Sequence, residues 1–312
     1  MDISVVLPVY NESGNLKVFI PEISHVLTTL GRSYEIIAVD DGSSDDSVET
    51  LRHLKKSEPN LRIVRFRRNF GQTAGFAAGF DLARGACVIT MDADGQNDPA
   101  DIPKLLKVME DGDYDIVSGW RVNRKEPFFS RRLPSMLGNQ LIRKTTGVTL
   151  HDYGCSLKLY HWQVAKNVQL YGELHRFIPA LASGLGVRVA EVPVNDRARQ
   201  YGKSKYNITK TIRVILDLLT VTFLLTYQAR PMQLFGLAGL TSGGVGFLLA
   251  LGLSIYKLVS GADIGDRPLL SLAILLIILG VQFLVMGLLG ELQVRTYYEV
   301  QNKPIYFIRT EE

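Results

Sequence analysis

Two aspartates separated by one residue, Asp92 and Asp94, are the residues of this sequence whose spacing most clearly suggests chemistry. Alternate residues of an extended segment point the same way, so both carboxylates can reach one hard cation. A divalent ion with few protein ligands keeps positions open for a substrate diphosphate and neutralises the charge of a leaving diphosphate. Turns and helix caps also use Asp freely, so the pair gains meaning only from its neighbours.

Similar polar clusters follow three other short apolar runs. The four clusters are Pro8–Glu12, Asp40–Asp45, Arg68–Gln72 and Asp92–Gln96. In an open parallel sheet, ligands bind at the carboxyl ends of the strands, and four clusters at one edge are hard to explain as turns alone. Within the second cluster, the carboxylate of Asp41 can accept hydrogen bonds from a base or ribose.

The apolar runs before these clusters are expected to be strands, with helices between them. The strands are Ile3–Leu7, Glu35–Val39, Arg62–Phe66, Cys87–Met91 and Asp115–Ser118, and helical spacing occurs near 14–30, 45–57, 71–84 and 99–111. This alternation predicts an α/β fold with a parallel sheet covered on both faces. Ser44 or Asp45 is expected to cap the second helix. Asp98-Pro99 is expected to start the fourth helix, and Pro21 to kink or delay the first.

Two long uncharged segments follow this domain, at Pro231–Tyr256 and Pro268–Gly290. Each exceeds the roughly 20 residues that a helix needs to span a bilayer, although two buried core helices would give the same pattern. We expect an α/β domain over 1–207, transmembrane helices over 231–257 and 268–290, and a tail over 291–312. Residues 208–230 combine three charges with an apolar face, which favours a helix lying in the membrane interface over a third span.

The basic residues that flank the spans predict the orientation of the chain. Arg230 precedes the first span, and Arg295, Lys303 and Arg309 follow the second. By the positive-inside rule, the domain and the tail are both expected in the cytosol. The start of the sequence has no secretory-signal pattern. The two cysteines offer no disulfide framework, which agrees with a reducing compartment.

Other chemistries are poorly supported. The sequence contains no Gly-x-x-x-x-Gly-Lys-Ser/Thr phosphate loop, no Gly-x-Gly-x-x-Gly after the first strand, and no Gly-x-Ser-x-Gly elbow. His151 and His175 have no metal-ligand spacing with either cysteine. The formal net charge of +4 gives no argument for a nucleic-acid partner.

Taken together, the four clusters resemble the family 2 glycosyltransferases of GT-A fold. The subgroup that they resemble is the polyprenyl-phosphate glycosyltransferases, and the similarity extends to the two apolar segments and Lys303-Pro304-Ile305-Tyr306. The resemblance implies a GT-A domain followed by an interfacial helix and two transmembrane helices at a bacterial inner membrane, and it implies a homo-oligomer, a tetramer. It identifies the family well and the sugar poorly.

The resemblance also implies roles for individual residues. Metal ligands for Mg²⁺ or Mn²⁺ are Asp92, Asp94 and Gln96, and the nucleotide-binding residues are Pro8, Tyr10, Glu12, Asp41 and Asp92. The residues expected to bind the donor and acceptor phosphates are Arg121, Arg131 (or equally Arg132), Ser135, Arg199 and Lys203. Arginine suits such sites because its planar fork binds phosphate oxygens in pairs.

The segment His151–Lys158 is similar to the Asp-Tyr-Gly-Cys segment of the undecaprenyl-phosphate aminoarabinose transferases. Other branches carry an Asp with a base-like role where this chain has Cys155, and the nearest carboxylate here is Asp152. A base is not essential, because a phosphate monoester with a second pKa near 6 is already largely a dianion at pH 7. We therefore assign catalysis to Asp94, Arg121 and Asp152, with Asp152 orienting the sugar or a basic side chain.

The expected reaction is an inverting, metal-dependent transfer of a sugar from a UDP- or GDP-linked donor to undecaprenyl or dolichyl phosphate. A processive polysaccharide synthase of the same fold would carry more spans and a Gln-x-x-Arg-Trp motif, which this sequence lacks. A non-catalytic membrane scaffold would be expected to lose the aspartate pair or the arginines. A soluble transferase acting on protein would not need the two apolar segments.

Overall fold

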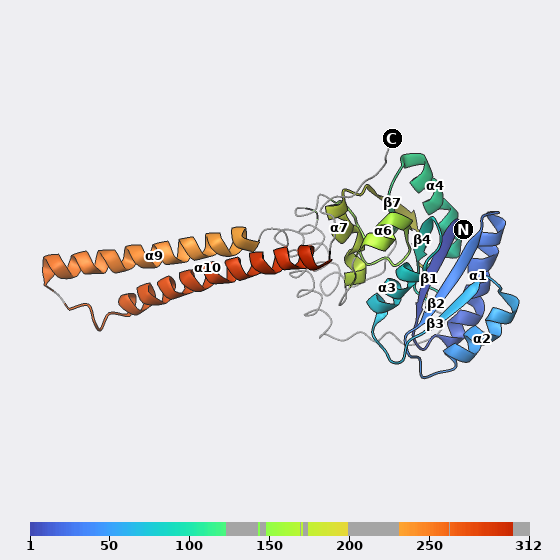
Figure 1. Ribbon diagram of the computed structural model, residues 1–312. Helices are drawn as coiled ribbons and strands as arrows, with labels where there is room; N and C mark the ends of the chain where they lie inside the picture. The colour runs from blue at the N-terminus through green and yellow to red at the C-terminus, as the bar shows by residue number, and fades with distance from the viewer. Residues whose placement is uncertain are drawn as a thin grey trace. The chain divides into compact units, whose positions relative to one another are not determined.

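The computed structural model describes residues 1–122, 143, 148–168, 170, 174–198, 231–261 and 263–301 of the chain. The chain divides into two compact units, Met1–Thr222 and Phe223–Glu312, which are described separately below. The first unit is an α/β domain and the second is built from two long helices (Figure 1). The predicted interfacial helix over 208–230 lies outside the described residues, as do residues 302–312 of the tail.

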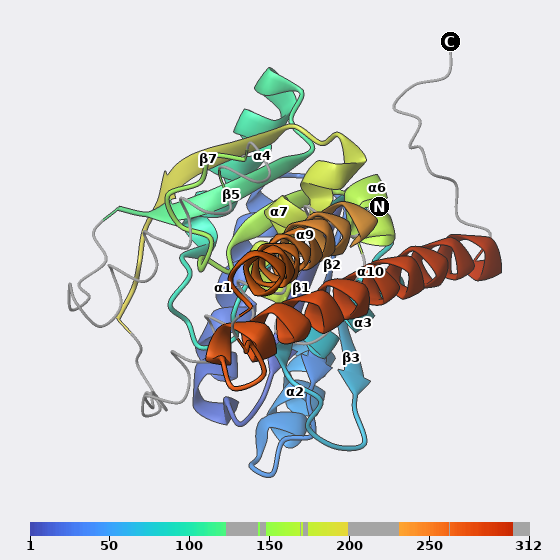
Figure 2. The same cartoon turned by 90° about the vertical axis from the view of Figure 1, so that its left-hand side faces the viewer.

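A seven-stranded sheet forms the centre of the first unit, in the order β3-β2-β1-β4-β6-β5-β7. The strands are β1 (Ile3–Val9), β2 (Tyr34–Asp40), β3 (Leu61–Arg65), β4 (Cys87–Thr90), β5 (Ile116–Arg121), β6 (Lys158–His161) and β7 (Val189–Val194). Strands β3 and β7 lie at the two ends of the sheet (Figure 2). All five strands expected from the sequence are confirmed, and β6 and β7 are added to them.

The sheet is mixed, which corrects the expectation of a parallel one. Strand β1 pairs in parallel with β2 and β4, and β5 pairs in parallel with β7, but β6 runs antiparallel to both β4 and β5. The reversal follows from the connection before β6. The chain leaves β5 at Arg121 and enters β6 at Lys158, and both residues lie at the edge where β1, β2 and β4 end.

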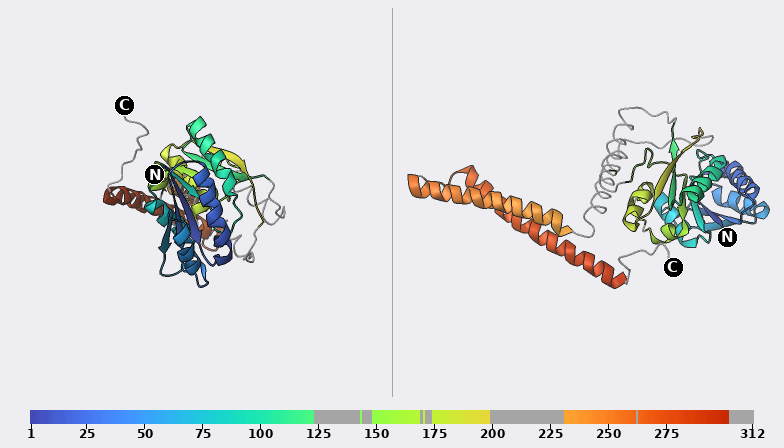
Figure 3. Two further views of the ribbon diagram at one scale, coloured as in Figure 1. Left: turned by 90° about the vertical axis from the view of Figure 1, so that its right-hand side faces the viewer. Right: turned by 90° about the horizontal axis from the view of Figure 1, so that it is seen from above.

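Helices cover both faces of the sheet, as the apolar runs predict. They are α1 (Ser13–Thr29), α2 (Ser47–Ser57), α3 (Gln72–Leu82), α4 (Ile102–Gly112), α6 (Trp162–Asn167) and α7 (Ile178–Ala182). Side chains of α1, α2 and α4 share one apolar core with alternate residues of β1, and those of α3, α6 and α7 share the core on the opposite face. Figure 3 (left) shows the blue helices α1 and α2 beside the sheet.

Local signals explain where the helices begin. Asp98 accepts a hydrogen bond from the backbone of Ala100 and starts the 3-10 turn Pro99–Asp101 that leads into α4, as expected. Asp45 accepts from the backbone N–H of Ser47 at the start of α2, although the N-cap residue itself is Asp46. Pro21 lies inside α1, which runs without interruption from Ser13, so the later start is wrong.

Helix α3 lies unusually close to β1 because two of its residues are glycines. A Cβ atom on Gly79 would stand 2.1 Å from a methyl carbon of Val6, and one on Gly75 would stand 2.9 Å from Cβ of Pro8. Neither distance is sterically possible, so this approach requires glycine. The close contact places Gln72, at the start of α3, over the carboxyl end of β4.

The second unit consists of α9 (Pro231–Ser260) and α10 (Pro268–Gln301), which run side by side (Figure 3, right). Both are long and apolar enough to cross a membrane, with mean hydropathies of 1.8 and 2.8, and most of their large apolar side chains are exposed. The helices meet through small residues: a Cβ on Gly280 would stand 2.7 Å from Cα of Gly243, and one on Gly246 would stand 2.7 Å from the carbonyl oxygen of Ala273. Such contacts are typical of helix pairs in bilayers.

Candidate active site

The aspartate pair lies in a tight turn directly after β4. The backbone N–H of Asp92 donates to Oδ1 of Asn97 at 3.0 Å, and the N–H of Gln96 donates to Oδ1 of Asp94 at 3.1 Å. Asp92 is partly buried and Asp94 is only 7% exposed. Asn97, which the sequence did not single out, closes this turn.

The electrostatics of the turn fit a divalent cation. Burial, followed by the negative charge of Asp94, raises the pKa of Asp92 above its ordinary value. Two partly desolvated carboxylates that repel each other are relieved by a bound cation. Among the described residues, no group of three His, Cys, Asp or Glu side chains forms a metal cage. The donor set is therefore that of an open site, in which a cation would keep positions for substrate oxygens.

Asn97 joins this turn to the segment that carries Asp152. Its Oδ1 atom accepts from the N–H of Asp92 and also from the hydroxyl of Ser156, at 2.8 Å. Asn97 is 3% exposed, so both bonds are shielded from water. The two predicted catalytic segments are thus bonded to each other through one side chain, although they lie far apart in the sequence.

Arg121, at the carboxyl end of β5, forms a two-point ion pair with Asp152. Nε of Arg121 donates to Oδ2 at 2.7 Å and Nη2 donates to Oδ1 at 3.1 Å. The two side chains are 12% and 8% exposed. Burial alone would lower the pKa of Arg121, but its bonds to Asp152 raise the pKa above its ordinary value, so the guanidinium stays charged.

A second carboxylate, Glu191 of β7, holds the backbone beside Asp152. It accepts from the backbone N–H groups of His151 and Asp152, each at 2.9 Å, and from Nδ1 of His151 at 2.7 Å. The ring of His151 also stacks on Trp120 with centroids 4.4 Å apart. Sequence reasoning missed Glu191, because a single Glu in a strand carries no local signal of its partners.

The nucleotide side of the edge is built around Asp41. Its two oxygens accept from the backbone N–H groups of Phe70, at 2.6 Å, and Gly71, at 2.9 Å. Each oxygen retains a second acceptor site for a ligand. The next residue, Gly42, has φ +72°, and a Cβ there would stand 2.6 Å from the backbone carbon of Arg68, so the turn requires glycine. Asp41 thus ties the loop after β2 to the loop after β3.

The remaining predicted nucleotide residues follow β1. Pro8 packs beneath Gly75, and Tyr10 is 42% exposed at the same edge. The carboxylate of Glu12 accepts from the amide of Asn15 at 2.5 Å. Between them, Asn11 adopts φ 58° and accepts from the backbone N–H of Ser44 at 2.8 Å, which ties the loops after β1 and β2 together. The structure therefore brings these residues to one edge of the sheet.

Four predicted phosphate-binding residues, Arg131, Ser135, Arg199 and Lys203, lie outside the described residues, as does the alternative Arg132. Cys155, which stands where other branches carry an Asp, is fully buried, and burial raises its pKa to about 11. It is therefore a neutral thiol at pH 7.

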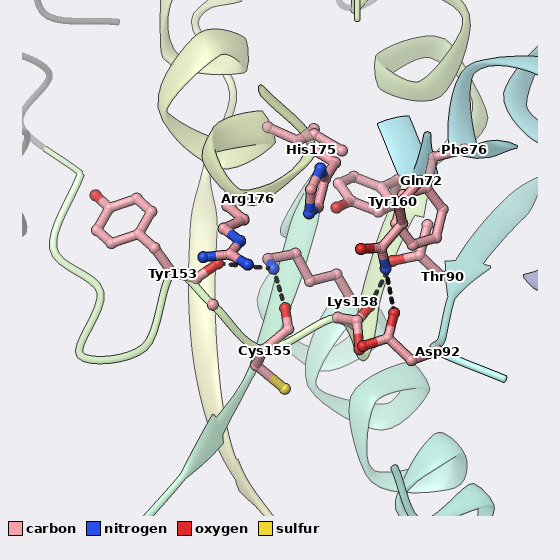
Figure 4. Close-up of a pocket in the computed structure, with 13 residues that line it drawn as sticks. Gln72, Phe76, Thr90, Asp92, Tyr153, Cys155, Lys158, Tyr160, His175 and Arg176 are labelled. Carbon is pink, nitrogen blue, oxygen red and sulfur yellow. Dashed lines mark hydrogen bonds between the residues drawn. The ribbon is translucent and has the colours of Figure 1, made fainter. Parts of the chain in front are cut away.

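A small polar pocket of about 60 Å³ lies next to Asp92 (Figure 4). Gln72 forms one wall and donates a hydrogen bond to Oδ1 of Asp92. The pocket is also lined by Lys158 and Tyr160 of β6 and by His175 of the 3-10 turn Leu174–Phe177. Buried polar residues on these elements have no sequence signal, because β6 itself was not predicted.

Comparisons with known proteins agree with this geometry. The family model described as "Glycosyl transferase family 2" matches residues 4–168. The chain is 43% identical over 312 residues to a dodecaprenyl-phosphate galacturonate synthase of Rhizobium johnstonii, covering 99% of this chain and 92% of the relative. It is 40% identical over 310 residues to an undecaprenyl-phosphate 4-deoxy-4-formamido-L-arabinose transferase of Edwardsiella ictaluri, covering 98% and 93%.

Among solved structures, the chain resembles glucosyl-3-phosphoglycerate synthase of Mycobacterium tuberculosis in complex with Mn²⁺ and UDP-glucose. The TM-score is 0.57 and the identity is 19%, with 71% of this chain and 79% of that chain covered. At this identity the likeness establishes the fold, a Rossmann-like GT-A domain.

Proposed function

Because the chain belongs to glycosyltransferase family 2, we propose that it transfers one sugar from a nucleotide-diphosphate sugar to a polyprenyl phosphate, with inversion and with a divalent cation. The names of the two relatives described above both give a polyprenyl phosphate as the acceptor, but they give different sugars. Both matches extend over nearly the whole chain, so they include the two apolar helices as well as the GT-A domain.

The observation that carries this proposal is the bridge made by Asn97. It bonds the Asp92–Asp94 turn to the segment that holds Asp152 and, through it, Arg121. A cation ligand set and a fixed guanidinium therefore lie at one edge of the sheet. A transfer between two phosphorylated substrates needs both, because a leaving diphosphate and an attacking phosphate repel each other.

Asp92 and Asp94, with Gln96 beside them, would hold Mg²⁺ or Mn²⁺. The bound cation would neutralise charge on the donor diphosphate. The residues after β1 and β2 would hold the nucleoside, with Asp41 using its remaining acceptor sites. Arg121 would bind a phosphate of the donor or acceptor through the N–H groups that Asp152 leaves unused.

No general base is required in this scheme. The acceptor phosphate carries no proton on its attacking oxygen at pH 7. Asp152 is engaged with Arg121 at two points, and its role is to fix the direction of that guanidinium. It acts as a positioning residue rather than as a proton acceptor.

The two apolar helices would anchor the enzyme where its lipid substrate is. Leaving the bilayer would cost a polyprenyl chain about 0.8 kcal/mol per exposed methylene, so the reaction is confined to the membrane surface. We place the domain on the cytosolic face, from the basic residues that flank the spans. We also propose a homo-oligomer, a tetramer, from the family resemblance.

The test is a reaction of the purified full chain in detergent with undecaprenyl phosphate, Mn²⁺ or Mg²⁺, and a panel of UDP- and GDP-sugars. Lipid products are identified by mass spectrometry. We expect one sugar per lipid, no product with EDTA, and none from Asp94→Asn. Arg84→Gln, an exposed residue at the amino end of β4, serves as the matched control. Several sugars per lipid would instead indicate a processive synthase, and no product from any donor would indicate a scaffold.

A further inference from the structure

The pocket beside Asp92 contains a buried lysine that forms no ion pair with any described residue. Lys158 is 2% exposed, and its ammonium donates to the backbone carbonyls of Tyr153, at 3.2 Å, and Cys155. Within the part of the chain that the structure describes, no carboxylate lies within ion-pair distance of it. A buried ammonium normally has a counter-charge, because carbonyl dipoles compensate its desolvation only in part.

Two more hydrogen-bond donors, Tyr160 and Arg176, line the same pocket. The hydroxyl of Tyr160 is fully buried and forms no hydrogen bond of normal geometry with a described residue, although it interacts with the hydroxyl of Thr90, which donates to the carbonyl of Ser156. Arg176 is exposed and forms no ion pair there. Figure 4 shows the side chain of Lys158 at the centre of the pocket, Tyr160 beside Gln72, and Arg176 on the side away from Asp92.

The other polar groups of the pocket are already occupied. Gln72 donates to Asp92, and Nδ1 of His175 bonds to the hydroxyl of Thr73 at 2.8 Å. Burial lowers the pKa of His175 to about 3, so its ring is neutral and adds no charge. Apart from Asp92, which accepts from Gln72, the described lining of the pocket offers no carboxylate to Lys158, Arg176 and Tyr160.

The size and place of the pocket restrict what can bind there. The pocket has a cavity volume of about 60 Å³, and one water molecule needs about 10–15 Å³ of such volume. The pocket therefore holds a few water-sized groups, such as the two oxygens of a carboxylate. It shares Asp92 with the cation site, so a sugar whose diphosphate lies on that cation has its ring beside the pocket mouth. A substituent on the ring, rather than a whole ring, fits it.

We propose that Lys158, Tyr160 and Arg176 form a subsite for a carboxylate on the donor sugar, so that the donor is a nucleotide-linked hexuronate. This inference rests on the proposed function and adds the chemical class of the sugar. The carboxylate supplies acceptor oxygens for the Tyr160 hydroxyl, for the Arg176 guanidinium and for the N–H of Lys158 that its two carbonyls leave unused. The negative charge of Asp92 is offset when Asp92 holds its cation.

The experiment compares donors that differ only at this substituent: UDP-galacturonate with UDP-galactose, and UDP-glucuronate with UDP-glucose. The purified full chain is assayed with undecaprenyl phosphate, and kcat/KM is measured for each donor. We expect one uronate to exceed its neutral partner by at least about 100-fold. Tyr160→Phe and Arg176→Gln should each reduce that ratio by about 10- to 100-fold, the range that a hydrogen bond to a charged group supplies.

Tyr160→Phe is the most informative variant, because it removes a hydroxyl that forms no hydrogen bond of normal geometry in the described structure. It should leave the melting temperature unchanged or raise it, so loss of uronate transfer cannot be attributed to unfolding. Lys158→Met is expected to abolish uronate preference, and Lys158→Arg to retain part of it. Arg84→Gln should leave the ratio unchanged.

Three outcomes would overturn the subsite: equal use of charged and neutral donors, an equal fall for both donors in the variants, or a rise only in the KM for lipid phosphate. The last would assign the anion to the acceptor. Calorimetric binding of the same donors separates this inference from the proposed function. A uronate preference in binding without any lipid product would retain the subsite and reject the transfer reaction.

Discussion

Asp152 holds the guanidinium of Arg121 at both Nε and Nη2, so the arginine that faces the sheet edge is fixed in direction by a residue at the start of the segment before β6. Oδ1 of Asp152 also accepts from the N–H of Gly154 at 3.1 Å. An arginine without this partner could adopt many rotamers, and a phosphate would have to order it on binding. The pair performs that ordering during folding.

We expect Asp152→Asn to lower kcat by about 10- to 100-fold, since the amide can accept from only one of the two N–H groups that the carboxylate holds. Asp94→Asn should lower kcat by about 1,000-fold or more, because it removes electrostatic stabilisation of the leaving diphosphate. Steady-state kinetics with saturating cation measure both. A comparable, near-complete loss in the two folded variants would contradict a positioning role and indicate that Asp152 acts as a base.

Glu191→Gln should lower kcat by about 10-fold with little change in nucleotide affinity. The carboxylate of Glu191 accepts hydrogen bonds from three N–H groups of His151 and Asp152. A glutamine would place an NH₂ donor against some of these N–H donors, so those hydrogen bonds would be lost. The resulting shift of Asp152 reaches Arg121 but not the residues around Asp41. The measurement is kcat together with UDP binding by calorimetry, with the exposed Glu49→Gln on α2 as control. An equal loss of UDP binding would indicate general disruption of the domain instead.

The stability of the protein should fall as the pH drops below about 6.5, in part because of His175. Burial depresses its folded-state pKa to about 3 from the ordinary 6.5. Between these values the unfolded chain binds a proton that the folded chain excludes, so this contribution is complete above pH 6.5 and is lost progressively toward pH 3. It amounts to about 1 kcal/mol between pH 7 and 5.5.

Denaturant unfolding of the full chain in detergent, followed by the fluorescence of the first unit, gives the free energy of unfolding at pH 7 and at pH 5.5. The difference between the two values measures this loss. His175→Asn should show a smaller loss between pH 7 and 5.5 than the unchanged protein. His53→Asn, an exposed position on α2, should show the same loss as the unchanged protein. Identical pH dependence in all three proteins would mean that His175 is not buried in the neutral form.

Gly280→Ala should destabilise the packing of α9 on α10 by about 1–3 kcal/mol, because the new methyl group would stand 2.7 Å from the backbone of Gly243. Gly244→Ala is the matched control, since nothing lies within 4 Å of its Cβ position, and it should be neutral or slightly stabilising through helix propensity. Thermal unfolding followed by circular dichroism in detergent compares them. Equal melting temperatures would show that the helices do not pack closely in solution.

Much of the fold could be predicted because its signals are local. The buried strands β1, β2 and β4 are mostly apolar runs that lead into polar residues, and parallel pairing brings those ends to one edge. For this reason Asp41, Asp92 and Asp94 could be selected before their contacts were known. The two helices of the second unit were equally visible, since their length and lack of charge are properties of single segments.

The rest depended on contacts between distant residues. Strand β6 is a short Lys-Leu-Tyr-His segment with a buried lysine, and neither its length nor its composition indicates a central strand. Without β6 the sheet reads as parallel, and Lys158 and Tyr160 cannot be placed. Asn97 and Glu191 were missed for the same reason: each acts by accepting N–H or O–H groups from a segment that only tertiary structure brings near.

Because β6 runs antiparallel to β5, the connection between these two strands begins and ends at the same edge of the sheet. Strand β5 delivers the chain to the ligand-binding edge at Arg121, and β6 takes it back from that edge at Lys158. Insertions or deletions between Arg121 and Leu150 therefore need no change in strand register or in the helices that cover the sheet. Evolution could therefore alter this stretch of sequence while Arg121 and Asp152 keep their positions at the edge of the sheet.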